Sequence, residues 1–220
     1  MCHIKNINTS KPFISACLIK YNNIDYIIST GNKNDFIKIF NINGEQISNI
    51  NNSNEEYNFI DSYYDKKSNK YYIITGNNGH VRSYDFKENK IYHEYNDNSM
   101  TSHCSIIIND NEEIIKLIES CWDWNIRIWN FHSGKLLKKI KTNIKFLNSL
   151  CLWNNNYLFV GSSDKTIKLI DINKGTIVKE FYGHNKNVIT VKKIVYPNYG
   201  EFLLSQGIHN DVIKLWVIKI

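Results

Sequence analysis

Few residues in this sequence have the side-chain types and spacing that catalysis or metal binding would require. His184, Ser205 and Asp211 are the residue types of a hydrolytic triad, in which a histidine activates a serine and a carboxylate orients the histidine. No nucleophile elbow accompanies Ser205. The same side chains can form a buried structural set, because a buried imidazole needs an acceptor and a carboxylate fixes its tautomer. The structural interpretation is favoured, and we predict no catalytic residue.

Metal and cofactor chemistry has little support. Cys2 lies beside His3 and His103 lies beside Cys104, but neither pair has the spacing of a zinc site. There is no glycine-rich phosphate loop of the Walker or dinucleotide type. We therefore expect no metal, no cofactor and no enzymatic activity. Acidic residues that could be read as an acid/base pair recur instead at equivalent turn positions: Asp35, Asp123, Asp164 and Asp211.

The elements that carry these residues repeat along the chain. Apolar segments with period-two alternation, rich in β-branched and aromatic residues, dominate, and capped runs with helical spacing are absent. One of these segments recurs five times, and each copy has a large apolar residue at the same place, here called the anchor. Successive anchors are 44, 45, 41 and 46 residues apart, a period typical of four-stranded propeller blades. The anchors are Phe40, Tyr84, Trp129, Ile170 and Trp216.

The best-preserved repeat, residues 161–184, has a tight turn, an alternating strand, a second turn at 173–175, another strand and the dipeptide Gly183-His184. It resembles the back half of a WD40 repeat, and weaker copies cover nearly the whole chain. The resemblance implies an all-β propeller of about five four-stranded blades in residues 12–220. The blades are expected at approximately 12–50, 57–95, 101–141, 146–182 and 188–220.

The repeats are degenerate members of that family. Gly183-His184 is the one Gly-His dipeptide at the right place, and no repeat has a complete Trp-Asp pair ending its third strand. In WD40 blades a His, a Ser or Thr, a turn Asp and the anchor Trp form a buried hydrogen-bonded set. The resemblance implies that set here in His184, Ser205, Trp216 and either Asn210 or Asp211.

The fifth repeat has no fourth strand after its anchor strand. Residues 1–11 contain the strand-like segment Cys2–Ile7, and we expect this segment to supply the missing outer strand and close the ring. Two alternatives stay open, namely an open arc that oligomerises and a piece of a longer propeller. Seven blades is the usual WD40 number, and five is a departure from it.

Composition narrows the class of protein. The net charge is +6, but only Arg82 and Arg127 are arginines, whereas nucleic-acid readers usually rely on arginine.

The five cysteines form no CxxC pair and follow no secretory signal, so we expect free thiols in a reducing compartment, the cytoplasm or alternatively the nucleus. No apolar run approaches membrane-spanning length. The 33 asparagines are spread through the turns, where they can adopt left-handed backbone in place of the scarce glycines.

These features predict a non-enzymatic scaffold that holds other proteins or peptides on its loop face, as a subunit of a larger complex. Trp122 and Trp124 flank Asp123 in a turn that is normally small and polar in this family, and exposed tryptophan is a typical interface anchor. Both rings could instead pack inward over an irregular blade. The alternative function is binding of RNA or an acidic surface through the lysine excess. The other residues predicted on the partner-binding face are Lys33, His80, Lys165, Lys186 and His209.

Overall fold

The computed structural model describes residues 13–31, 36–50, 56–97, 101–109, 114–144, 146–209 and 211–218. The described residues contain 19 strands in five antiparallel sheets and no helix. The predicted all-β architecture is confirmed. Residues 1–11, together with Lys33 and Asn210, fall outside the described residues, so the expected closing strand stays a prediction.

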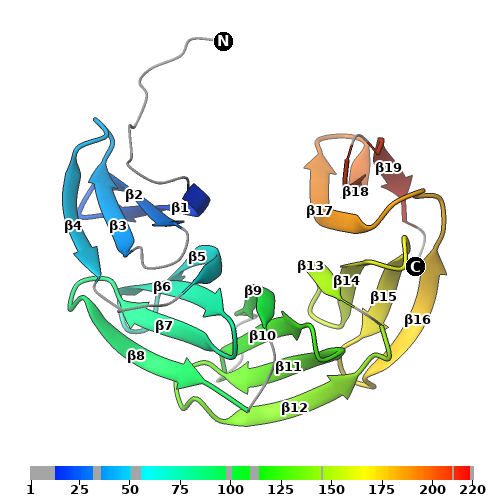
Figure 1. The fold of residues 1–220 in the computed structure, drawn as a ribbon, viewed down its shortest axis with the longest axis horizontal. Helices are drawn as coiled ribbons and strands as arrows, with labels where there is room; N and C mark the ends of the chain where they lie inside the picture. The colour runs from blue at the N-terminus through cyan, green and yellow to red at the C-terminus, as the bar shows by residue number, and fades with distance from the viewer. Residues whose placement is uncertain are drawn as a thin grey trace. The chain divides into compact units, whose positions relative to one another are not determined.

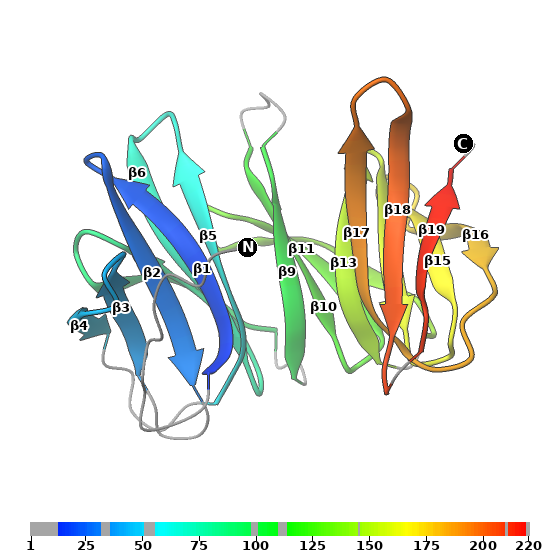
Figure 2. The same ribbon diagram turned by 90° about the horizontal axis from the view of Figure 1, so that it is seen from above.

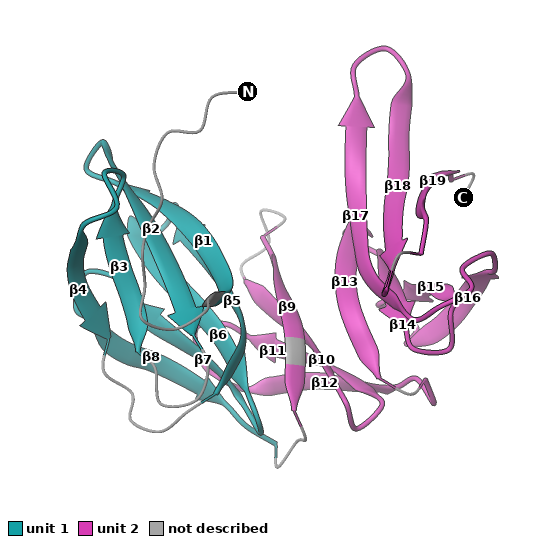
Figure 3. Cartoon of the chain, turned by 45° about the horizontal axis from the view of Figure 1, so that its top comes forward, with its two compact units in different colours: residues 1–98 teal, residues 99–220 magenta. Residues whose placement is uncertain are grey.

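The chain divides into two compact units, residues 1–98 and residues 99–220 (Figure 3). Unit 1 holds the first and second sheets, each a four-stranded meander (Figure 1). The strands of the first sheet are β1 (Phe13–Tyr21), β2 (Ile24–Gly31), β3 (Ile37–Asn41) and β4 (Gln46–Ile50). Those of the second are β5 (Tyr57–Asp65), β6 (Lys70–Asn77), β7 (Val81–Asp85) and β8 (Lys90–Tyr95).

Unit 2 holds the third, fourth and fifth sheets, and the fifth has three strands among the described residues (Figure 2). The third sheet comprises β9 (Ser102–Ile108), β10 (Lys116–Cys121), β11 (Asn125–Asn130) and β12 (Leu136–Lys141). The fourth comprises β13 (Leu147–Asn154), β14 (Tyr157–Ser162), β15 (Ile167–Asp171) and β16 (Thr176–Phe181). The fifth comprises β17 (Val188–Tyr196), β18 (Gly200–Gly207) and β19 (Ile213–Val217).

The core of each unit lies between neighbouring sheets. In unit 1, Ile28 and Ile39 of the first sheet pack in one cluster with Ile73 and Tyr84 of the second. In unit 2 one cluster joins the third and fourth sheets around Ile118, and another joins the fourth and fifth. Because a sheet between two neighbours is covered on both faces, its third strand is buried along its whole length, as β15 is.

Asparagines adopt left-handed backbone in several turns, as the sequence suggested. Of the ten described non-glycine residues with positive φ, six are asparagines, including Asn22 and Asn23 between β1 and β2 and Asn69 between β5 and β6. Asparagine tolerates the left-handed region better than other side chains do, so it makes these tight turns without glycine. The other four residues in this region include Trp124, to which we return below.

The sheet packing in unit 2 can be tested by truncating a core side chain. Ile118 is fully buried in the cluster between the third and fourth sheets, so Ile118→Ala should lower the free energy of unfolding of unit 2 by about 2–5 kcal/mol. Tryptophan fluorescence during urea unfolding reports this unit selectively, because all five tryptophans lie in it. Leu137→Ala, on an exposed position of β12, is the control and should change the value by about 0.5 kcal/mol or less.

Candidate functional site

The fifth sheet brings together four of the predicted residues. The Trp216 indole N–H donates to Ser205 Oγ at 2.7 Å, and His184 Nε2 lies 2.7 Å from the same oxygen. His184 Nδ1 lies 2.9 Å from Asp211 Oδ2, so Asp211 is the turn carboxylate that contacts the imidazole. The hydrogen bond with His184 is the main cause that lowers the pKa of Asp211.

The serine and the histidine of this set are closed off from solvent. Ser205 is 1% exposed, so its hydroxyl is closed to a substrate, and its oxygen already accepts the Trp216 N–H. His184 is buried as well, and its ring lies 6.2 Å from that of Trp216. The arrangement joins the connection before β17 to the third strand of the same sheet by hydrogen bonds that leave no buried polar atom of these side chains unmatched.

The third sheet contains a comparable buried network that sequence reasoning missed. Glu119 on β10 is fully buried. Its Oε1 accepts the indole N–H of the anchor Trp129 at 3.0 Å, and its Oε2 accepts the hydroxyl of Ser102 at 3.2 Å. Glu119 thus holds the position that Ser205 holds in the fifth sheet, since each lies two residues beyond the partner of the anchor in the strand register. A single glutamate inside the apolar segment 114–121 was the available signal.

Arg127 balances this carboxylate. Its side chain is 1% exposed and forms a two-pronged ion pair with Asp123, with Nη1–Oδ1 at 3.0 Å and Nη2–Oδ2 at 2.5 Å, and its Nε lies 4.0 Å from Glu119 Oε1. Burial raises the pKa of Glu119 to about 7, although the hydrogen bond from Trp129 and the charge of Arg127 act in the opposite direction. The hydrogen bonds from Arg127 hold the pKa of Asp123 below its usual range despite its partial burial. Asp123 is therefore a structural turn carboxylate.

A basic residue occupies the same place as Arg127 in all five sheets, two residues before the anchor: Lys38, Arg82, Arg127, Lys168 and Lys214. Where the third strand is deeply buried, this cation has carboxylate partners, since a buried charge is costly without them. Lys168 is 4% exposed, and its Nζ lies 3.0 Å from Asp164 Oδ2 and 3.1 Å from Glu180 Oε1. Arg82 pairs with Glu94 at 2.7 Å. The lysine excess is thus in part an internal feature of the sheets.

The turn between β10 and β11 carries the strongest candidate for partner binding. Trp124 is 43% exposed and has φ +67°, and the equivalent turn residue in the fourth sheet, Lys165, has φ +71°. The Trp124 carbonyl accepts hydrogen bonds from both the N–H and the hydroxyl of Thr142, which holds the turn against the segment after β12. A bulky side chain in left-handed backbone costs about 1–2 kcal/mol, and such strain is concentrated at functional sites.

Two more aromatic residues accompany Trp124. Trp122 is half-buried, and its ring meets that of Phe146 edge-on at 5.1 Å between centroids. Phe146 is 42% exposed and also has positive φ, at +49°. We call Trp122, Trp124 and Phe146 the aromatic turn cluster. Of the two predicted orientations for the tryptophans, Trp124 adopts the outward one, while Trp122 lies partly inward against Phe146.

The remaining predicted face residues that the structure describes lie in both units. Lys165, Lys186 and His209 are exposed in loops of unit 2. His80 belongs to unit 1, where its Nε2 lies 2.9 Å from the Asn77 side chain. In the part of the chain that the structure describes, no group of three or more His, Cys, Asp or Glu side chains has the arrangement of a metal site, and no helix is long and apolar enough to cross a membrane.

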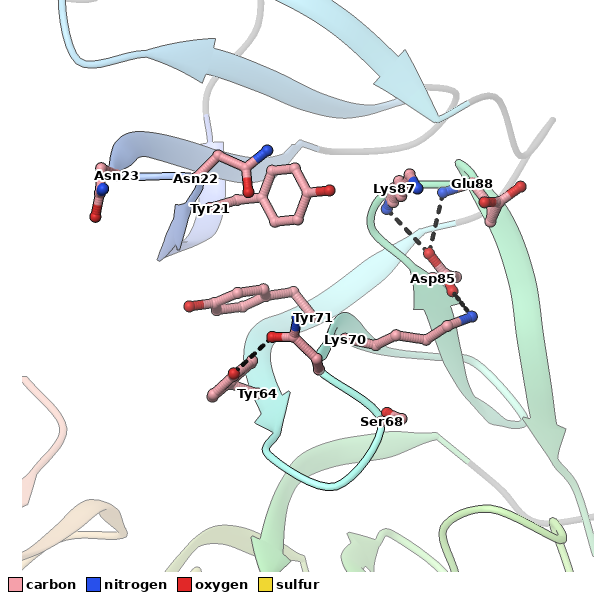
Figure 4. A pocket seen from close by; sticks show the side chains of 11 residues that line it. Tyr21, Asn22, Asn23, Tyr64, Ser68, Lys70, Tyr71, Asp85, Lys87 and Glu88 are labelled. Atoms are coloured by element: carbon pink, nitrogen blue, oxygen red, sulfur yellow. Dashed lines mark hydrogen bonds and ion pairs between the residues drawn. The ribbon is translucent and has the colours of Figure 1, made fainter.

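Unit 1 contains a polar pocket of about 440 Å³ between its two sheets (Figure 4). Its polar groups bind one another. Lys70 Nζ lies 2.7 Å from Asp85 Oδ2, Asp85 Oδ1 accepts two backbone N–H groups, and Tyr64 donates to the Asn69 side chain. Tyr64 stacks on Tyr71 with centroids 4.5 Å apart. The pocket walls are thus stabilised internally, and the aromatic turn cluster remains the better candidate.

The raised pKa of Glu119 predicts a pH-dependent stability. In the folded unit the Glu119 carboxyl keeps its proton up to about pH 7, whereas its pKa has the ordinary value of 4.5 in the unfolded chain. The free energy of unfolding should therefore fall as the pH rises from about 4.5 to about 7, by at most about 3 kcal/mol. Glu119→Gln should flatten the decline in urea titrations at several pH values. In the control Glu180→Gln the decline should persist, because hydrogen bonds from Tyr182 and Lys168 lower the pKa of Glu180.

The backbone of Trp124 predicts an unusual mutational response. Trp124→Gly should change the free energy of unfolding by about 1 kcal/mol or less, because relief of the left-handed strain offsets the lost ring contacts. Trp129→Ala, at a buried anchor, should cost about 3–5 kcal/mol in the same urea experiment followed by circular dichroism. A loss at Trp124 as large as that at Trp129 would show that its ring serves the fold.

Comparisons with known proteins agree with this geometry. Residues 134–171, which run from the end of the third sheet through β15, match the family model described as WD domain, G-beta repeat. The chain superposes on the WD40 β-propeller domain of Doa1 with a TM-score of 0.74 and 16% sequence identity, covering 93% of this chain and 64% of that one. At that identity the likeness shows the fold.

Curated relatives match about half of the chain. A ribosome biogenesis protein WDR12 homolog of Culex quinquefasciatus is 31% identical over 103 residues, which is 46% of this chain and 24% of that protein. The ribosome biogenesis protein ytm1 of Aspergillus terreus is 26% identical over 122 residues, or 54% and 25%. The matched region thus spans about a quarter of each relative. Taken with the five sheets, these findings show that residues 134–171 match a WD40 repeat and that the chain has the fold of a WD40 β-propeller.

Proposed function

We propose that this WD40 chain is a non-enzymatic scaffold that holds a protein partner on the aromatic turn cluster, within an assembly that takes part in ribosome biogenesis. The observation that carries the proposal is Trp124, a large aromatic side chain that is 43% exposed on a strained turn where the fourth sheet has a lysine. An aromatic ring that gives little to the fold and is held rigidly in solvent is the usual form of an interface hot spot.

The assembly part of the proposal is supported by the relatives of this chain, which are ribosome biogenesis proteins. That role favours the nucleus, which the sequence left as the alternative to the cytoplasm. The buried cations bear on the competing RNA hypothesis. Arg127 and Lys168 are paired inside the sheets, so they are not available to phosphates.

The proposal can be tested by sedimentation of the tagged chain in lysates of its own cells, on sucrose gradients at about 0.15 and 0.5 M salt. We expect the chain to migrate with pre-ribosomal particles at both salt concentrations. The double variant Trp122→Ala/Trp124→Ala should migrate with free protein, whereas the control Leu137→Ala should behave as the native chain does. These changes affect the partner surface and leave the buried anchors intact.

Two results would contradict this function. Loss of particle association at the higher salt, with both tryptophan substitutions harmless, would favour RNA or acidic-surface binding, because phosphate contacts weaken steeply with salt. Migration as free protein under every condition would remove the ribosome biogenesis role. Fluorescence anisotropy with a single-stranded RNA 20-mer, measured across the same salt range, separates these two outcomes.

A further inference from the structure

We propose that the outer edge of β19 is a docking site for an extended strand of a partner protein, in which a glutamate or aspartate directly precedes a large apolar residue. This surface lies on the fifth sheet and is separate from the aromatic turn cluster. The inference goes beyond the proposed function and fails or holds independently of it.

The edge itself is exposed and apolar. β19 pairs with β18 on one side, and no described strand of unit 2 pairs with its other side (Figure 2). Ile213, Leu215 and Val217 are 62%, 61% and 69% exposed, whereas every residue of the corresponding strand β15 is buried. An unpaired strand with such side chains is a template for another strand.

The four complete sheets define what that strand must look like at its end. In each complete sheet, one residue near the end of the outer strand lies opposite the third-strand residue three positions before the anchor: Ile50 opposite Ile37, Tyr95 opposite Val81, Ile140 opposite Ile126 and Phe181 opposite Ile167. All four outer residues are large, apolar and at least half-buried. The equivalent third-strand residue in the fifth sheet is Ile213, so a large apolar residue is required opposite it.

At the preceding position, two of the four complete sheets place a carboxylate opposite the third-strand cation, and the other two have Asn49 and Lys139 there. Arg82 lies directly opposite Glu94 and Lys168 directly opposite Glu180, and both pairs form ion pairs, at 2.7 and 3.1 Å. Lys214 is the equivalent cation in the fifth sheet. A carboxylate one residue before the large apolar residue therefore complements Lys214, as cross-strand opposite charges do.

The register fixes the rest of the pattern. In each complete sheet a bulge interrupts the pairing of the third and outer strands just before the anchor. The incoming segment should therefore follow the pattern shared by residues 91–95 and 177–181: Ile, an apolar bulge residue, any residue, Glu, and an aromatic residue. An open pocket of about 340 Å³, lined by Tyr182, Gly183, Lys214, Leu215 and Trp216, lies at this edge and gives the incoming strand room.

The first residues of this chain fit that pattern poorly. In the sequence, each of these four outer-strand residues lies seven positions before the first residue of the next sheet: Ile50 and Tyr57, Tyr95 and Ser102, Ile140 and Leu147, Phe181 and Val188. The same spacing from Phe13 assigns Asn6 to the apolar position and Lys5 to the place opposite Lys214. Residues 1–11 contain no Asp or Glu. A partner strand satisfies both requirements, and this segment satisfies neither.

The test uses the full chain and a labelled, end-blocked peptide with the sequence of β16, Thr176–Phe181, followed by fluorescence anisotropy. We expect saturable binding, with at least a tenfold loss for the Glu180→Lys peptide. In the protein, Lys214→Glu should reverse this preference and restore binding of the Glu180→Lys peptide. Absence of saturable binding of the native peptide, or equal binding of the two peptides to the native chain, would overturn the proposal even if the Lys214 variant did not fold.

Two further measurements identify the occupant. Deletion of residues 1–8 should leave the peptide affinity unchanged, and a tenfold or greater gain would show that the chain's own first residues cover the edge. Sedimentation equilibrium should show a monomer over a range of concentrations. Self-association that the β16 peptide abolishes would assign the edge to a second copy and would also overturn the proposal.

Discussion

These sheets depend on one constraint: the third strand is covered on both faces although it carries a cation. The third strand of a sheet that has neighbours on both sides is removed from water along its length, yet each repeat places a lysine or arginine two residues before the anchor. An unpaired buried charge costs several kcal/mol, so each such cation needs carboxylates at fixed places. Asp123 and Asp164, which the sequence alone could suggest as catalytic carboxylates, are the ion-pair partners of Arg127 and Lys168.

The different sheets meet this need in different ways. The second and fourth sheets place a glutamate on the outer strand, at Glu94 and Glu180. The third sheet has Lys139 at that position, opposite Arg127. The carboxylates near Arg127 are instead those of Asp123 in the turn and Glu119 on β10. Glu119 also accepts the anchor indole, a role that Ser205 plays in the fifth sheet, where His184 takes the place of Ser102 as the second partner. The polar sets thus differ in chemistry but hold the same two strands.

Much of the fold could be predicted because its signals are local and periodic. Each of the five anchors lies in the third strand of one sheet. The His184 set was predictable through family resemblance, because its residue types recur at known places. The Glu119 network was not, since a glutamate in an apolar segment gives no sign of its partners until the register aligns it with Ser102 and Trp129. The outward direction of Trp124 depends on the left-handed backbone of its turn, which the sequence does not encode as a glycine would.

The constant sequence spacing between outer and first strands has a consequence for how such a chain can change. Because the outer-strand residue that faces the start of the third strand lies seven positions before the next sheet in all four cases, a whole repeat can be added or removed without altering the spacing at the junction. Duplication or loss of a 41–46-residue block by recombination therefore creates no new type of connection.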